Sequence, residues 1–365
     1  MHTHERERRY SGAMLVATAA AVAGLYRSDW KASPAPVFTG IVRRAVGKTL
    51  DAPPEPRPYT SPPRQICFTA KYFAAEGVPE EHIKGVLDLA AIVADAAGSW
   101  EPLTDPLTLL RYYLGAQGNV KAAAKKFRNT LSWRTSRRKP VNEVMHMYGF
   151  EDSYDKDSGR VDDASSWLWK PYARRTEESR QVTRHVSFAR LRAVSVAGEP
   201  ILVWRIRPDD FKTFSKCGLH DHLVDAFVAH AEDALQALRS ASIERKKLLR
   251  ARFVLDVEGL GVGSVQFLPV LKETTQIGQR YYPEITASVT IIRAPMLATS
   301  LYRLVSLILP KRFQKKICIL GADFSKGLAK HAGLQSCLLP VSLDGSSDED
   351  LEELWSGSHS STQRA

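Results

Sequence analysis

Hydrophobic residues recur at helical spacing in three stretches of the first half of the chain. Residues 79–97 open with a proline and then place an apolar residue every three or four positions, which predicts a helix with one buried face. A second helix is expected from a cap at Thr104 or Asp105 to Gly115, because a first-turn proline and a final glycine mark typical helix boundaries. A third is expected after Asn119, where apolar positions follow at steps of four, three and four. These elements predict a small N-terminal helical module.

The period of the pattern changes in the second half. HVSFARLRAV and EPILVWRIR suit two β-strands joined by a tight turn, and a long amphipathic helix is expected from about His220 to Leu238. Strands and helices then alternate, with further strands in RFVLDVEG, SVTIIRA and KICILGA. Such alternation implies parallel pairing with right-handed crossovers. The predicted fold class is therefore α/β, a mainly parallel sheet flanked by helices.

The chain divides into five expected regions. They are residues 1–77 as a targeting or disordered extension with a proline-rich linker, 78–140 as the helical module, 141–184 as a polar connector, 185–345 as the α/β domain and 346–365 as an acidic, polar tail. In the first region, RERRYSG before an apolar run is typical of a signal peptide, whereas the following Arg, Ala, Ser and Pro are typical of transit peptides. Targeting and plain disorder both stay open.

The formal net charge of +11 is unevenly distributed over the 365 residues. Acidic residues gather in DGSSDEDLEEL, while Lys and Arg form separate clusters, and this asymmetry points to nucleic acid or a membrane face as an anionic partner. Nucleic acid is the weaker alternative, because it needs exposed aromatics among the basic residues, and Phe127 falls in a buried stripe, leaving only Trp133. No apolar run reaches the roughly 20 residues that a membrane-spanning helix needs.

Motifs for catalysis or metal binding are missing from the sequence. VLDVEGLGVGS lacks the third glycine of a dinucleotide fingerprint, so Asp256 is interpreted as a hydrogen-bonding residue at a strand end. No Gly-x-Ser-x-Gly occurs, His220 and His222 point to different sides of a helix, and the four cysteines lie far apart. The protein is expected not to be an enzyme. No catalytic residue, metal site or cofactor is predicted.

One stretch is too apolar for a helix that is buried on a single side. MLATSLYRLVSLIL, residues 296–309, covers more than one helical face and runs into the basic cluster KRFQKK. Ordinary core packing is one explanation. A helix that closes over a hydrophobic ligand and then meets a bilayer is the other. The side chains assigned to this gate and to the pocket behind it are Met296, Leu297, Leu301, Leu304, Val305 and Ile308.

In this order, the motifs of residues 79–345 resemble those of the CRAL-TRIO family. The resemblance rests on TLLRYYLGAQGNVKAAAKKFRNTLSWR in the helical module, followed by VLDVEGLGVGS, YYPEITASVTIIRAP, the apolar stretch, ILPKRFQKKICILGA and LPVSLDG. It implies a hydrophobic pocket that is floored by the sheet and holds one lipid. It also implies that residues 296–309 form a gate helix that opens at membranes.

The resemblance also implies a headgroup site. In members that bind phosphatidylinositol, the glutamate of Tyr-Tyr-Pro-Glu and a lysine before the next strand contact the headgroup, and Glu284 and Lys316 match them here. Other positions depart from the family, since apolar residues replace its basic or polar ones. These are Ile285, Phe313, Leu114 and Ala116 at positions used for phosphatidylinositol, and Ala251 and Phe253 at positions used for phosphatidylcholine.

We therefore expect a non-enzymatic lipid-binding or lipid-transfer protein. It would hold one ligand, phosphatidylinositol or a related phospholipid, in a gated pocket and exchange it at membranes, with Lys311, Arg312 and Lys315 docking on an anionic surface. The alternatives are a carrier of a neutral isoprenoid-type lipid and a membrane-associated interaction or signalling module with the same fold. A cytoplasmic, peripheral location is expected, or an organelle if the N-terminal extension is a targeting peptide.

Overall fold

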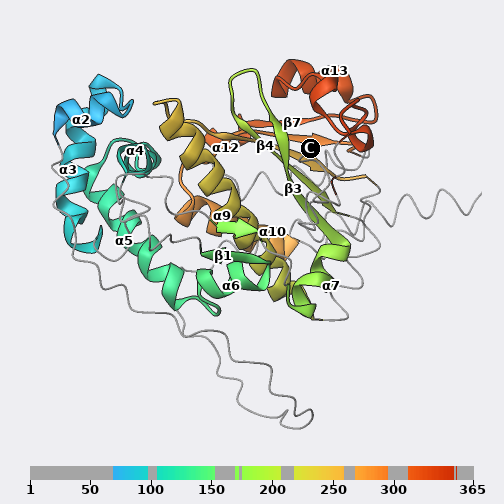
Figure 1. Cartoon of the computed structure of the whole chain (residues 1–365), viewed down its shortest axis with the longest axis horizontal. Helices are drawn as coiled ribbons and strands as arrows, with labels where there is room; N and C mark the ends of the chain where they lie inside the picture. Colours follow the sequence, from blue (N-terminus) through green and yellow to red (C-terminus); the bar gives the residue numbers. More distant parts are fainter. Residues whose placement is uncertain are drawn as a thin grey trace, which may run out of the picture. The chain divides into compact units, whose positions relative to one another are not determined.

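The computed structural model of the protein describes residues 69–97, 105–152, 169–171, 175–206, 218–258, 268–294 and 311–348, together with Leu351 (Figure 1). The helices of its first part are α2 (Ala70–Ala75), α3 (Glu80–Ala97), α4 (Pro106–Gly115) and α5 (Val120–Ser136). None of the described helices combines the length and the apolarity that spanning a bilayer requires.

Side-chain caps begin the helices where the sequence predicts them. The Asp105 carboxylate accepts a hydrogen bond from the Thr108 backbone N–H at 2.9 Å, and Pro106 occupies the first turn of α4. The Asn119 side chain accepts from the Ala122 N–H at 2.9 Å and starts α5 in the same way. The three predicted helices of the module are therefore confirmed.

The polar segment that we expected to act as a connector contains secondary structure of its own. It includes the helices α6 (Val141–Met147) and α7 (Glu177–His185) and a small antiparallel pair, β1 (Phe150–Asp152) with β2 (Trp169–Pro171). Helix α6 packs against the long helix α9 (His220–Glu244), and α7 packs against both α9 and the first strand of the main sheet. Val141, Val144 and Met145 of α6 are buried, so the expectation of a polar connector overlooked an apolar helix face at its start.

The main sheet has five strands, of which four run parallel, as the sequence predicts. Their spatial order is β3-β4-β5-β6-β7, and only the β3–β4 pair is antiparallel. The tight turn between those two strands is closed by a hydrogen bond from the Ser195 N–H to the Glu199 carbonyl at 3.0 Å. The strand bounds are β3 (Val186–Val194), β4 (Pro200–Ile206), β5 (Ala251–Asp256), β6 (Thr286–Ile292) and β7 (Ile317–Ile319).

Each face of the sheet has its own hydrophobic core. Leu202 and Phe253 point to the face covered by α9 and α10 (Leu268–Tyr281), which shares one core with the helical module. Their neighbours Val203 and Val254 point to the other face, as the two-residue period of a strand requires. The elements in the C-terminal part are α12 (Lys311–Gln314), α13 (Ser325–Gly327), η3 (Leu328–Ala332), η4 (Ser336–Leu338) and η5 (Val341–Leu343).

A buried ion pair joins the helical module to the α/β part. Arg134 of α5 donates two hydrogen bonds of 2.6 Å to the carboxylate of Glu232 on α9, and both side chains are only 1% exposed. The Tyr282 hydroxyl donates to the same carboxylate at 2.7 Å. The module is thus held by directional contacts as well as by apolar packing, since every charge in this contact has a partner.

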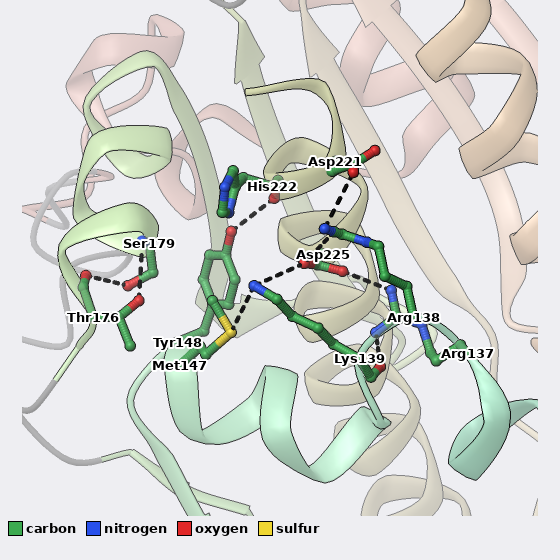
Figure 2. A network of polar contacts seen from close by, with 10 residues as sticks. All are labelled: Arg137, Arg138, Lys139, Met147, Tyr148, Thr176, Ser179, Asp221, His222 and Asp225. Atoms are coloured by element: carbon green, nitrogen blue, oxygen red, sulfur yellow. Dashed lines mark hydrogen bonds and ion pairs between the residues drawn. The ribbon is translucent and has the colours of Figure 1, made fainter. Parts of the chain in front are cut away.

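A second set of charges fixes the end of α5 to the beginning of α9 (Figure 2). The Asp225 carboxylate is fully buried and accepts hydrogen bonds from Arg137 at 2.7 Å and Arg138 at 2.8 Å. The Lys139 ammonium lies 3.7 Å from the same carboxylate, and Arg138 also pairs with the exposed Asp221. This part of the basic segment 121–140 therefore makes an internal contact and is not a free nucleic-acid surface.

Replacing Arg134 by methionine should lower the free energy of unfolding by about 3–5 kcal/mol, because Glu232 would remain as a buried, unpaired charge. The double variant Arg134→Met/Glu232→Leu should lose less, since it leaves no buried charge. Urea denaturation measures both. Arg190→Met is the control, since it breaks an ion pair with Asp233 in which Arg190 is 46% exposed, and it should cost less than about 1 kcal/mol. A double variant as unstable as the single one would contradict this assignment.

Candidate functional site

The two predicted headgroup residues lie at the edge of the sheet where the parallel strands begin. Glu284 precedes β6 by two residues and Lys316 directly precedes β7. Arg250 directly precedes β5, so the strand that follows Glu284, β6, lies between the strands that follow Arg250 and Lys316. Because the starts of parallel strands meet at one edge, side chains from three distant parts of the sequence gather there.

The carboxylate of Glu284 is the centre of this group. The Nε and Nη2 atoms of Arg250 both lie 2.9 Å from its Oε2 atom, and Nη1 of Arg312 lies 3.7 Å from its Oε1 atom. The carboxylate is largely shielded, with the Glu284 side chain 12% exposed, while the two arginines are 33% and 51% exposed. The arginines therefore keep donor groups open to solvent on the outer side of the site.

The backbone of Glu284 is held in a left-handed conformation, with φ at +54°. A residue with a side chain adopts this conformation only at a cost of about 1–2 kcal/mol, so the surroundings must stabilise it. Arg111 of α4 does so, since its guanidinium donates to the Glu284 carbonyl at 2.9 Å. The same buried guanidinium donates to the Leu249 carbonyl at 2.7 Å and to the Ser242 hydroxyl at 3.1 Å.

Two lysines complete the group of positive charges. Lys316 donates a hydrogen bond to the Thr286 carbonyl at 2.6 Å. Partial burial lowers the pKa of Lys316, Glu284 raises this pKa, and Arg250 and Arg312 lower it. Burial also lowers the pKa of Lys126 on α5, with a further lowering by Arg312 and an opposing effect of Glu284. Both lysines are thus in a site with more positive than negative charge, and a bound anion would stabilise their charged forms. We call Lys126, Arg250, Glu284, Arg312 and Lys316 the edge cluster.

Sequence reasoning missed three of the cations that surround Glu284. Lys126 and Arg250 belong to basic clusters that the sequence related only to nucleic acid or a membrane face, and Arg111 lies in a stretch in which only the apolar period was informative. Arg250 had one usable signal, because it stands directly before a predicted buried strand. The other two come from helices α4 and α5, whose distance from the strands no local pattern predicts.

The positions at which this chain departs from the family pattern are apolar packing positions. Ile285, Ala251 and Phe253 are buried, and Phe313, Leu114 and Ala116 are partly buried against the same core. The apolar side chains at these positions pack into the core, so the replacement of polar residues by apolar ones leaves no gap at the sheet edge. The Arg111 guanidinium, one helical turn before Leu114, reaches the turn that carries Glu284.

The predicted gate residues, from Met296 to Ile308, lie outside the described part of the chain. Of the predicted docking residues, Lys311 and Lys315 are exposed. Arg312 contacts Glu284 as well, so it belongs to the edge cluster in addition to its predicted docking role.

The opposite edge of the sheet holds Asp256, which has the structural role that the sequence predicts. Its buried carboxylate accepts hydrogen bonds from Arg205 at 2.9 Å and Arg293 at 2.8 Å, and both arginines also donate to the Ser342 carbonyl. Among the residues that the structure describes, no group of His, Cys, Asp and Glu could hold a metal ion. Trp133 is stacked on Tyr281 with ring centroids 4.1 Å apart, so it is not an open stacking platform.

Comparisons with known proteins match this architecture to one family. Residues 193–345 match the CRAL/TRIO domain. The chain is 23% identical over 271 residues to the SEC14 cytosolic factor of Eremothecium gossypii, covering 73% of this chain and 77% of that protein. It is 24% identical over 289 residues to the SEC14 cytosolic factor of Candida glabrata, covering 78% of this chain and 85% of that protein.

Solved structures give a more distant likeness. The crystal structure of Sfh5 aligns with 78% of this chain and 94% of that chain, at a TM-score of 0.48 and 11% identity. The sequence matches, the mostly parallel sheet and the order of the motifs agree with one another. Residues 193–345 are similar to the CRAL/TRIO domain, and about three quarters of the chain is similar to SEC14 cytosolic factors.

Proposed function

We propose that the protein carries one phospholipid with an anionic headgroup of the phosphatidylinositol type and exchanges it at membranes. The observation that carries this proposal is the charge of the edge cluster. Lys126, Arg250, Arg312 and Lys316 lie around the carboxylate of Glu284, and the buried Arg111 contacts its backbone, so positive charges outnumber the one negative charge. A phosphate group supplies the missing negative charge and accepts hydrogen bonds from arginine in a bidentate geometry.

The fixed position of Glu284 supports a sugar-like headgroup beside that phosphate. A carboxylate accepts hydrogen bonds from hydroxyl groups, and inositol carries several of them. Arg111 holds the turn that bears Glu284, so the acceptor is oriented before a ligand arrives. Because Arg250 and Arg312 lie between Glu284 and solvent, a phosphate approaching from outside would meet them first.

The proposed site for the acyl chains is the hydrophobic side of the same domain. Residues 296–309 are mostly apolar and are followed after Pro310 by α12, which carries Arg312 of the edge cluster. A lipid with its headgroup at this edge would therefore have the proposed gate next to it in the sequence. The proposal gives the gate helix the task of covering the acyl chains and of opening at a bilayer.

A carrier of a neutral lipid is the competing function. It is favoured by the apolar residues that replace family polar positions, such as Ile285 and Phe313. The edge cluster argues against it, because a neutral headgroup would leave the excess cations uncompensated in a partly buried site. The proposed location is the cytoplasm, peripheral at membranes, and the printed name of the relatives, SEC14 cytosolic factor, supports it.

The double variant Lys126→Ala/Arg250→Ala should reduce the transfer of labelled phosphatidylinositol between vesicles by about tenfold or more, since each lost charged hydrogen bond contributes about 1.5–3 kcal/mol. The matched control for the lysine is Lys121→Ala, an exposed residue on the same helix. It should transfer lipid at the wild-type rate. Circular dichroism checks that both variants fold. Unchanged transfer by the folded double variant would contradict the headgroup assignment and favour the neutral lipid.

Replacing Leu301 and Leu304 by aspartate should abolish lipid exchange while the protein stays folded. A charged side chain at the centre of a bilayer costs about 2.5–3.5 kcal/mol, so the altered segment could not enter the membrane. Vesicle transfer measures exchange, and Leu301→Ala/Leu304→Ala serves as an uncharged control with a smaller loss. A folded aspartate variant that exchanges lipid at the wild-type rate would rule out this gate. An unfolded one would identify the segment as ordinary core.

A further inference from the structure

A second surface at the same edge of the sheet has no role in holding the ligand. It consists of Val194 and Val196 at the β3–β4 turn and of Arg245, Lys246 and Lys247 directly after α9, and we call it the hairpin surface. We propose that the hairpin surface binds an anionic lipid bilayer and forms a membrane contact separate from the gate helix and α12. The inference goes beyond the ligand proposal and can fail or hold independently of it.

The side chains of the hairpin surface are open to solvent. Val196 is 79% exposed and Val194 is 42% exposed, which places both among the most exposed large apolar residues in the described part of the chain. Arg245, Lys246 and Lys247 are also exposed. Single exposed valines are common on protein surfaces, so exposure alone does not indicate a function. The arrangement of the valines and the three cations is the relevant observation.

The turn and the basic residues form one continuous surface. Gly198 in the β3–β4 turn has φ at +76°, and a Cβ atom added to it would lie 1.7 Å from Nη1 of Arg245. The Arg245 guanidinium therefore lies directly over the turn that carries Val196. Figure 1 shows the turn between β3 and β4 as a loop that projects beyond the strands it joins.

The charge of this surface is positive and is not compensated internally. No carboxylate of the described residues forms an ion pair with Arg245, Lys246 or Lys247. The acid of the turn, Glu199, is already engaged by Arg252 and by the Ser195 hydroxyl. The Arg245 guanidinium thus adjoins the turn that carries the exposed valines, and Lys246 and Lys247 follow it directly in the sequence, with Glu244 as the nearest acid in the sequence.

The hairpin surface and α12 lie at opposite ends of one edge. The turn precedes β4, the residues after α9 precede β5, Glu284 precedes β6, and α12 precedes β7, so all four segments lie where the parallel strands begin. From β3 to β7 the sheet is four strand spacings wide, about 19 Å. A flat bilayer facing this edge would touch the exposed Lys311 of α12 and Lys315 directly after it at one end, and the hairpin surface at the other. Two contacts fix the orientation of the protein on the membrane, whereas one does not.

The side-chain types favour a bilayer over another anionic partner. Valines beside lysines suit the boundary between acyl chains and headgroups, because the apolar tips enter the boundary while the ammonium groups stay with the phosphates. Single-stranded nucleic acid is bound through aromatic stacking, and the hairpin surface contains no aromatic residue. An acidic protein partner would gain little from the exposed valine at the tip.

The experiment compares charge reversals at the two edges of the sheet by co-sedimentation with vesicles of phosphatidylcholine, with and without phosphatidylserine. Lys246→Glu/Lys247→Glu should weaken binding to the anionic vesicles by about tenfold or more at low salt, since each basic residue near such a surface contributes roughly fivefold. The difference should shrink as salt is added. The matched control is Lys326→Glu/Lys330→Glu, which changes the net charge by the same amount at the other edge of the sheet. Lys326 is next to Gly327, which lies against Leu320 just past the end of β7. The control should bind nearly as the wild type does.

A second pair of variants tests the apolar tip. Val196→Asp should weaken binding to the same vesicles. Val341→Asp is the control and should not weaken it, because Val341 is similarly exposed, at 71%, but is next to Ser342, whose carbonyl accepts hydrogen bonds from arginines at the opposite edge of the sheet. Equal losses in both charge reversals, or no loss from Lys246→Glu/Lys247→Glu, would overturn the proposal. Lipid retained by the purified variants separates the two proposals, because the hairpin variants should keep their ligand while losing vesicle binding.

Discussion

The buried guanidinium of Arg111 is the contact on which the rest of the site depends. It donates to the carbonyls of Leu249 and Glu284 and to the Ser242 hydroxyl, so helix α4 fixes the turns before β5 and β6 together. Burial lowers the pKa of Arg111 to about 10, which still leaves the group charged at neutral pH. Without this donor, the left-handed backbone of Glu284 and two buried acceptors would lose their partner.

The position of the helical module follows from this arrangement. A module held only by apolar packing could shift by a fraction of a turn without a large loss, whereas Arg111, Arg134 and Arg239 each require one geometry. Arg239 of α9 donates to the carboxylate of Asp105 at 2.8 Å, the same residue that caps α4. Stability and ligand recognition are therefore connected, because the contacts that attach the module also position Arg250 and Glu284.

Local patterns predicted the elements well and the edge cluster poorly. The caps at Asp105 and Asn119 and the β3–β4 hairpin depend on residues close in sequence, so turn chemistry and periodicity were sufficient. Lys126 and Arg250 are 124 residues apart and meet Glu284 only through the tertiary fold. Interpreting each basic cluster as one surface for an anionic partner fails here because one or two members of each cluster turn toward a shared carboxylate.

The central claim is that the cations at the start of the strands bind an anionic headgroup. The most direct test is mass spectrometry of the lipid that stays with the protein after purification from cells containing phosphatidylinositol. The account predicts about one phospholipid per chain, strongly enriched in an inositol phosphate headgroup over the membranes of the source cells. A stoichiometric neutral lipid, a phospholipid with the headgroup composition of bulk membrane, or no lipid at all would contradict it.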